Sequence, residues 1–464
     1  MSFGASASEQ ASGREFVEEL DMFTMLIRNG HVIAEPQSGD YGRVESVLIG
    51  GGLVIALGEE ADARRETADE IIDATGRIIL PGLVNAHMHS WQTVLRGMSL
   101  DWNLLEYLGN MHGRIMPVMT PEDVYLGNLA AALTQIAAGT TSLGDWCHAN
   151  PTPAHSDAAI AGLQEAGIRA VFFLVARRGA GHQRTEVERL ANSGSFSKGG
   201  LLTLGLAVDG PLYSSPEIAE ADLALAREMG LVATMHHSGG PSCPPEIWRR
   251  LIEKKLIGPS VNIVHGNTID DDLLDRLVDA GATFTVTPEV EMSDGHGHPI
   301  TGRLRRRGVA PAIGIDIESA VAPNLLAAAT VAMMHQRALD GAAVLTEPPD
   351  SGARIRRIEA LHWSTGAGAH ALGLDADVGR IAPGLQADLM IINGRALELW
   401  PNNDPVATAL RSHSAHVEHV MIAGQFAKRD GVLCSHNLDL LLDDMQAASE
   451  RIRTAANLTV SNRP

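Results

Sequence analysis

The sequence predicts an α/β protein in which a (β/α)8 TIM barrel carries a small β-sandwich domain built from both chain ends. Three observations lead to this prediction. The middle of the chain alternates short apolar runs with helical patterns, and eight such runs can be counted. The two ends share a texture of short strands separated by glycines and charged turns. A doubly wound open sheet is the alternative, but no G-x-G-x-x-G follows the first barrel strand.

The expected organisation divides the chain into five segments. A polar tail (1–21) precedes the first part of the sandwich (22–80), where stretches such as SVLIGGGLVIALG alternate like strands. The barrel covers residues 81–379, and the second part of the sandwich covers 380–433, which contains IAPGLQADLMIING. The last segment (434–464) contains LDLLLDDMQAASERIRTAA, an amphipathic helix that we interpret as a packing or oligomer helix.

Composition excludes several classes of function. The formal net charge is −20 and there is no basic run, which argues against nucleic-acid and anionic-membrane partners. No stretch approaches the roughly 18–20 apolar residues that span a bilayer. Three scattered cysteines form no disulfide framework, and the first residues are not those of a secretory signal. We therefore expect a cytoplasmic protein with a small-molecule substrate.

Five side chains that can bind a metal stand at the ends of predicted barrel strands. In PGLVNAHMHS, His87 and His89 point the same way, because side chains alternate along a strand. His236 ends the fifth strand, His265 the sixth and Asp316 the eighth. These strand ends open onto the face where barrel enzymes carry their active sites. The pattern predicts a metal centre there.

The five residues, together with four longer stretches, resemble the amidohydrolase superfamily. The stretches are HMHSWQTVLRG (87–97), TPEDVYLGNLAA (120–131), AAGTTSLGDW (137–146) and IAPGLQADLMII (381–392). They are similar to the branch of cytosine and guanine deaminases, S-adenosylhomocysteine deaminases and triazine hydrolases. The resemblance runs from about residue 22 to about residue 430 and implies a metal-dependent hydrolase, commonly a dimer or larger homo-oligomer.

The resemblance also implies how many metal ions are bound. Members with two metals bridge them by a carbamylated lysine at the fourth strand, and LLTLGLAVDGP has no lysine. Following the mononuclear branch, one ion is bound by His87, His89, His236 and Asp316. Zinc suits this set of nitrogen and oxygen ligands, and another divalent metal such as Fe²⁺ is possible.

The implied reaction is hydrolytic deamination of a small amino-substituted heterocycle by a metal-bound hydroxide. Asp316 accepts the proton of the attacking water, and His265 either polarises the developing oxyanion or steadies the hydroxide. The alternative is hydrolysis of an amide, urea, halo or thio substituent on a small aromatic compound. An alternative of another class is a non-catalytic barrel scaffold, although such a scaffold would be expected to have lost metal ligands.

One residue departs from the deaminase pattern. Resembling deaminases place a glutamate three residues after the fifth-strand histidine, where it protonates a ring nitrogen of the substrate. Here that position is Gly239. Glu289 and Glu291, just past the seventh strand, are the nearest substitutes, and Glu291 matches an asparagine of the resembling enzymes. We predict that Glu291, more than Glu289, contacts the substrate; two solvated loop acids are the alternative.

For some of the other candidate substrate contacts, a purely structural role is an alternative to substrate binding. Trp91 could equally belong to the core. His237 points away from the metal if its strand continues, and exposed loop histidines such as His296 are common. The remaining candidates occupy strand ends or match substrate contacts of resembling enzymes. The full expected substrate-binding set is Trp91, Gln92, Asp209, His237, Glu289, Glu291 and His296.

Overall fold

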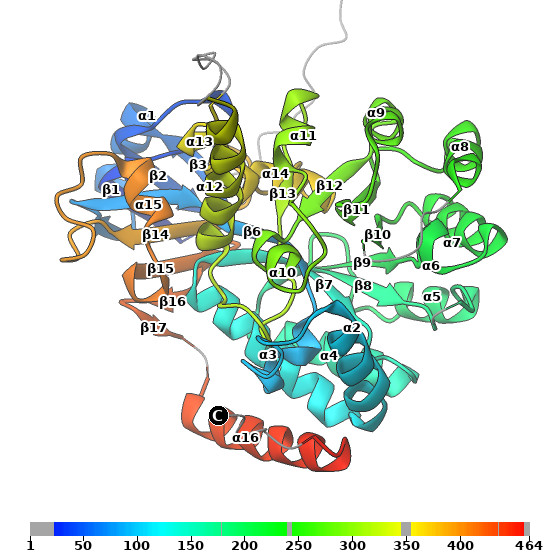
Figure 1. Cartoon of the computed structure of the whole chain (residues 1–464). Coiled ribbons are helices and arrows are strands. Elements are labelled where there is room, and N and C mark those ends of the chain that lie inside the picture. The colour runs from blue at the N-terminus through cyan, green and yellow to red at the C-terminus, as the bar shows by residue number, and fades with distance from the viewer. Residues whose placement is uncertain (1–22, 178, 239–243, 345–353, 435, 459–464) are drawn as a thin grey trace, which may run out of the picture.

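The structure is a computed structural model that describes residues 23–177, 179–238, 244–344, 354–434 and 436–458. Figure 1 shows a central barrel with its helices, a separate sheet in blue and orange at one side, and a C-terminal helix below. Gly239, where the resemblance places a glutamate, lies outside the described residues, as do the predicted N-terminal tail and the end of the C-terminal segment.

Eight parallel strands form the barrel, and each pairs with the next along the chain. In order they are β6 (Leu83–Met88), β7 (Thr140–Cys147), β8 (Arg169–Val175), β9 (Leu202–Ala207), β10 (Ala233–His237), β11 (Val261–His265), β12 (Thr283–Val286) and β13 (Ala312–Ile313). A parallel bridge between Met88 and Asp316 joins the first strand to the segment after the last. The barrel therefore closes beside two of the candidate metal ligands, and the predicted (β/α)8 fold is confirmed.

Burial on both faces explains why the barrel strands read as continuous apolar runs. In β8, Val171 and Phe173 point into the barrel, where they share a cluster with Trp146. Phe172, between them, joins the larger cluster under the surrounding helices. The side chains of RAVFFLV therefore pack alternately inside the barrel and against the helices around it.

Helices between the strands cover the outside of the barrel (Figure 1). The second strand is preceded by α3 (Pro121–Ala137), where Thr120 and Asp123 form a capping box and Pro121 occupies the first turn. Further helices include α4 (Pro153–Ala166), α5 (Arg184–Ala191), α7 (Pro216–Glu228), α8 (Pro245–Glu253), α9 (Asp271–Asp279), α11 (Thr301–Arg306), α12 (Leu325–Val344), α13 (Arg357–Trp363) and α14 (Gly366–Ala371). Two short helices, α2 (Leu104–Tyr107) and α10 (Pro288–Ser293), follow the first and seventh strands.

The two chain ends meet in one nine-stranded mixed sheet. Its N-terminal strands are β1 (Thr24–Val32), β2 (Arg43–Gly50), β3 (Leu53–Leu57), β4 (Glu70–Asp73) and β5 (Arg77–Pro81), and its C-terminal strands are β14 (Leu389–Asn393), β15 (Val417–Ile422), β16 (Gln425–Arg429) and β17 (Val432–Leu433). Antiparallel pairing of β5 with β14 joins the halves. In β5, Ile79 faces the sheet's own core, whereas Ile78 and Leu80 face the barrel cluster.

A buried ion pair links the barrel to this sheet. The Nε and Nη2 atoms of Arg169, at the start of β8, each lie 3.0 Å from a carboxylate oxygen of Asp388. Asp388 also accepts a hydrogen bond from the main-chain N–H of Ala423, at 2.8 Å. Because the side chains are only 8% and 2% exposed, this bidentate contact fixes the two units against each other.

The C-terminal helix α16 (Leu438–Ala455) packs against α3 through Met445, Ala448 and Ile452. Arg451 also pairs with Asp123 of α3. This agrees with its interpretation as a packing helix. In the described part of the chain, no helix has the length and apolar character needed to cross a membrane.

Candidate metal centre

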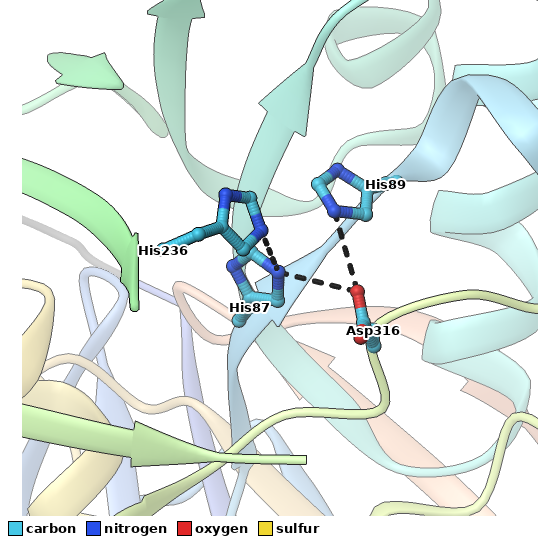
Figure 2. A group of neighbouring side chains, drawn as sticks. All are labelled: His87, His89, His236 and Asp316. Atoms are coloured by element: carbon cyan, nitrogen blue, oxygen red, sulfur yellow. Dashed lines mark hydrogen bonds and ion pairs between the residues drawn. The ribbon is translucent and has the colours of Figure 1, made fainter. Parts of the chain in front are cut away.

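Four side chains converge at the mouth of the barrel (Figure 2). The Nε2 atom of His87 lies 3.2 Å from Nε2 of His236 and 3.3 Å from Oδ1 of Asp316. The Nε2 atom of His89 is also 3.3 Å from Asp316 Oδ1. All four donor atoms lie within 4.8 Å of one another. Ligands held about 2.0–2.1 Å from a tetrahedral ion are themselves about 3.3 Å apart, so the spacing suits one metal ion.

The protonation states of these residues also suit a cation. Burial lowers the pKa of His87 to about 4 and that of His236 well below its ordinary value, so both imidazoles are neutral at neutral pH. Burial alone would raise the pKa of Asp316, but hydrogen bonds with His87 and His89 hold it well below its usual range. Deprotonated nitrogen and oxygen donors are what a divalent metal requires.

A main-chain carbonyl orients His89. Nδ1 of His89 lies 2.9 Å from the carbonyl oxygen of Trp146, which can only accept, so Nδ1 carries a proton and donates to it. Asp145, next to Trp146, accepts hydrogen bonds from the N–H of Ser90 and from the Asn128 amide. Burial raises the pKa of Asp145 to about 6. Asp145 thus anchors the chain segment that follows His89.

His265 lies beside the four residues but contacts them less closely. Its Nε2 atom is 4.0 Å from Asp316 Oδ2, and its ring stacks on His236 with centroids 5.3 Å apart. Both His265 (φ +71°) and Asp316 (φ +67°) have left-handed backbones. Such conformations are uncommon outside glycine and cluster at functional sites. His265 ends β11 and Asp316 follows β13 by three residues, and at both places the bent chain brings the side chain to the candidate metal centre.

A cavity of about 1400 Å³ opens directly over the centre. His89, His236, His265 and Asp316 line its floor. Its walls come from the segments after β6, β7, β8, β9 and β12, among them α2 and the start of α4. The position at the carboxyl ends of the barrel strands is the usual place of a barrel active site.

Two of the predicted substrate contacts line this cavity, Asp209 and His296. Asp209 accepts a hydrogen bond from the main-chain N–H of Gly179, at 2.7 Å. Nδ1 of His296 is 2.9 Å from the Ser238 hydroxyl, and its ring meets that of His265 edge-on. Both residues are therefore placed to touch a bound molecule.

Trp91 and Gln92 lie outside the cavity wall, contrary to expectation. The chain turns into a 3-10 helix (Ser90–Leu95) after His89, and this helix packs against α3. Trp91 is completely buried in the main apolar cluster. The side-chain amide of Gln92 donates a hydrogen bond to the Tyr107 hydroxyl at 2.6 Å and accepts one from the Ser319 hydroxyl at 2.9 Å. Packing and internal hydrogen bonds account for both residues.

His237, Glu289 and Glu291 also lie outside the cavity wall. The β10 strand continues through His237, so strand alternation turns its ring outward onto Trp248, 5.6 Å away between centroids. Glu289 is half-buried on α10. Glu291 is fully buried, but behind His265 rather than over the metal centre, with Oε1 3.3 Å from His265 Nδ1. The expected direct contact of Glu291 with substrate is therefore not what the geometry shows.

Several residues that line the cavity were not among the predicted site residues. Trp146 packs on His236 with ring centroids 3.9 Å apart, and His148, two residues later, lies 4.7 Å from His89. Trp146 lies on β7 and His148 follows the strand's end by one residue, so alternation along TTSLGDWCH puts both side chains on the same side. Asp294 and His112 also line the cavity; Asp294 follows the short helix α10, and His112 lies in a π-helix (Leu108–Ile115), whose repeat differs from that of an α-helix. Burial raises the pKa of Asp294 to about 6.

Comparison with known proteins defines the class. The profile of the Amidohydrolase family matches residues 78–246 and 250–427, and the chain belongs to that family. It is therefore a hydrolase of carbon–nitrogen bonds, as the sequence predicts.

Curated relatives of this chain include deaminases. A 5-methylthioadenosine/S-adenosylhomocysteine deaminase of Symbiobacterium thermophilum is 28% identical over 403 residues, covering 83% of this chain and 89% of that protein. A 5'-deoxyadenosine deaminase of Methanothermobacter thermautotrophicus is 27% identical over 380 residues, covering 79% of this chain and 85% of its own length.

Solved structures share the fold. An adenosine deaminase from Xanthomonas campestris with bound zinc superposes with a TM-score of 0.81 at 21% identity, covering 93% of this chain and 98% of its own. An atrazine chlorohydrolase from Arthrobacter aurescens TC1, complexed with zinc, superposes with a TM-score of 0.80 at 20% identity. The match covers 92% of this chain and 100% of that one.

Proposed function

We propose that this protein binds one zinc ion through His87, His89, His236 and Asp316 and hydrolyses an amino group from a heterocyclic substrate. The observation that carries the proposal is the donor set itself. Three imidazole nitrogens and one carboxylate oxygen, with nearest separations of 3.2–3.3 Å, meet at the floor of a large cavity. Fe²⁺ would suit the same ligands, and zinc is preferred because two proteins of this fold hold it.

When bound, the ion lowers the pKa of a water molecule to about 7 and so supplies a nucleophile at neutral pH. Residues of the chain then accept and donate the protons of the reaction. Asp316, ionised and buried, accepts the proton that the attacking water loses. His265, whose Nε2 atom lies 4.0 Å from Asp316 Oδ2, would assist from beside the candidate ligands. The leaving group departs as ammonia or an amine after it gains a proton.

Because position 239 is a glycine, another residue must supply the proton for the substrate ring. Of the carboxyl groups that line the cavity besides Asp316, Glu186 pairs with Arg189, and Asp209 accepts from Gly179. Asp294 is buried, with its side chain hydrogen-bonded by the Ser293 hydroxyl at 2.8 Å. Its raised pKa of about 6 makes it the wall carboxyl best suited to hold a proton near neutrality. We assign ring protonation to Asp294.

The cavity argues for a substrate larger than a bare heterocycle. Its volume of about 1400 Å³ exceeds the roughly 300–1,000 Å³ typical of small-molecule sites. The two deaminase relatives described above are named for 5-methylthioadenosine, S-adenosylhomocysteine and 5'-deoxyadenosine. An aminated heterocycle with an appended group, such as a 5'-substituted nucleoside, is therefore the first substrate class to examine.

A second candidate is supported by glycine at 239. Hydrolysis of an amide, urea, halo or thio substituent needs no protonation of a ring nitrogen, so it needs no donor at that position. The predicted homo-oligomer and cytoplasmic location stay predictions.

A substrate panel distinguishes the two candidates. Zinc-loaded protein is incubated with 5'-substituted adenosines, free aminated bases, chlorinated triazines and aryl amides, and ammonia, chloride and amine are measured. Ammonia from an aminated heterocycle, absent in the His87→Ala variant, supports deamination. Release of chloride or amine alone would favour the second candidate, and no release from any compound by zinc-replete protein would support the non-catalytic scaffold.

A further inference from the structure

The carboxyl group of Glu291 forms a buried contact with the ring of His265, on the side away from the metal centre. Glu291 Oε1 lies 3.3 Å from Nδ1, whereas Nε2 of the same ring is 4.0 Å from Asp316 Oδ2. We propose that Glu291 is a positioning residue: by accepting a hydrogen bond from Nδ1, it keeps the proton of His265 there and leaves the Nε2 lone pair facing the metal centre. The proposal rests on the proposed function for its catalytic consequence, but not for the hydrogen bond itself.

Burial raises the pKa of Glu291 to about 7, and neighbouring hydrogen-bond donors oppose that rise by stabilising the carboxylate as an acceptor. Its Oε1 accepts from the main-chain N–H of Thr287 at 2.8 Å, and its Oε2 from the side-chain amide of Asn267 at 3.3 Å. It also sits in the first turn of α10, where the helix end favours negative charge. Donors thus approach both carboxylate oxygens, and the ring nitrogen of His265 completes the set by donating as well.

Thr287 fits the same proton assignment. Its hydroxyl oxygen is 3.1 Å from His265 Nδ1 and 3.5 Å from Asp316 Oδ2. With the ring proton on Nδ1, the hydroxyl can accept from the ring and donate to Asp316. Every polar hydrogen in the group then has an acceptor. The opposite tautomer would place a lone pair of Nδ1 against a carboxylate, which is repulsive.

The ring of His265 is already fixed in orientation by other contacts. It stacks on His236 and meets His296 edge-on, at centroid distances of 5.3 and 4.8 Å. Packing therefore sets where the ring points, and what remains to be set is which nitrogen carries the proton. That choice decides between the two roles predicted for His265. With the lone pair on Nε2, the ring accepts a hydrogen bond from the attacking water instead of donating one to an oxyanion.

A double-substitution cycle with an independent spectroscopic readout tests the proposal. Glu291→Gln, His265→Asn and the double variant are compared in zinc content, kcat and KM on whichever panel substrate is turned over. Glu289→Gln is the matched control, since Glu289 lies two residues away on the same helix, half-buried, and has no recorded hydrogen bond or ion pair to the described residues. The tautomer of His265 is measured from ¹⁵N-histidine NMR spectra, with its signal assigned by its loss in His265→Asn.

We expect Glu291→Gln to lower kcat about 10–100-fold, the range for groups that orient a functional histidine, with KM and zinc content unchanged. In the His265→Asn background the same substitution should have no further effect. The NMR signal should show Nδ1 protonated in the wild type and in Glu289→Gln, and a shift toward the other tautomer in Glu291→Gln.

Two results would overturn the proposal. One is a wild-type spectrum with the proton on Nε2. The other is an effect of Glu291→Gln that persists undiminished without His265, which would mean that Glu291 acts on its own. If the wild-type protein turns over no compound, the tautomer measurement still decides the role of Glu291, and only the proposed function fails.

Discussion

The Nδ1 atom of His89 lies 2.9 Å from the carbonyl oxygen of Trp146, so a main-chain group of the second barrel strand orients a ligand of the first. Trp146 in turn packs its ring on His236, which comes from the fifth strand. The candidate ligands are therefore held in position by contacts through the barrel wall.

Removing one ligand should remove the metal and the activity together. We expect His87→Ala and Asp316→Ala to lose bound zinc and all measurable turnover, because the remaining donors hold the ion weakly and, for Asp316, the proton acceptor is also gone. Zinc is measured by mass spectrometry of dialysed protein. His370→Ala, an exposed histidine paired with Asp375, is the control and should retain both. Full turnover with an unchanged metal content in either ligand variant would refute the assignment.

His265 should behave differently from the ligands. We expect His265→Asn to keep its zinc and to lower kcat by about 10²–10⁴-fold, the range for a group that assists proton transfer or charge development. Metal content and steady-state kinetics are measured on the same preparation. Zinc lost in proportion to activity would place His265 among the ligands instead.

The pH dependence of kcat/KM for deamination should reveal the titration of Asp294. Burial raises its pKa to about 6, so its acid form dominates below that pH and is lost as the pH rises through it. If Asp294 protonates the substrate ring, kcat/KM should fall above about pH 6, and Asp294→Asn should remove this limb and lower kcat/KM by about 10²–10⁴-fold. A profile of the variant that matches the wild type would exclude Asp294 as the donor.

The ion pair between barrel and sheet should matter for stability. Arg169→Met leaves Asp388 buried without its cation, and we expect a loss of about 3–5 kcal/mol in the free energy of unfolding. The double variant Arg169→Met/Asp388→Leu should recover much of that loss. Arg276→Met, which breaks an exposed ion pair with Asp272, should cost less than about 1 kcal/mol. Urea unfolding monitors all three, and equal effects of the two single variants would contradict the buried pair's role.

The barrel and the metal residues were predictable because both follow from regular spacing. Eight apolar runs gave eight strands, and alternation along β6 placed His87 and His89 on one side. The same rule, applied past the end of the strand, failed for Trp91 and Gln92, because the chain turns into a 3-10 helix after His89. His148, one residue past the end of β7 and two past Trp146, does keep to the alternation and lines the cavity.

Residues in irregular segments could not be placed from sequence. Glu291 was expected to face the substrate, but its direction depends on how α10 begins, and the helix turns its carboxyl group toward the back of His265. Asp294, which ends the same helix, reaches the cavity instead. Local turns of this kind are set by tertiary contacts, which leave no periodic signal in the chain.

The most direct test of the account is anomalous diffraction at the zinc edge from crystals of the zinc-loaded protein. We predict one peak per chain, within about 2.0–2.2 Å of Nε2 of His87, His89 and His236 and of a carboxylate oxygen of Asp316. A second group of possible ligands, Glu418, His419 and Asp430, lies on the small sheet and serves as an internal comparison. A peak there alone, a peak bound by His265 in place of one of the four residues, or no peak from protein soaked with zinc would contradict the account.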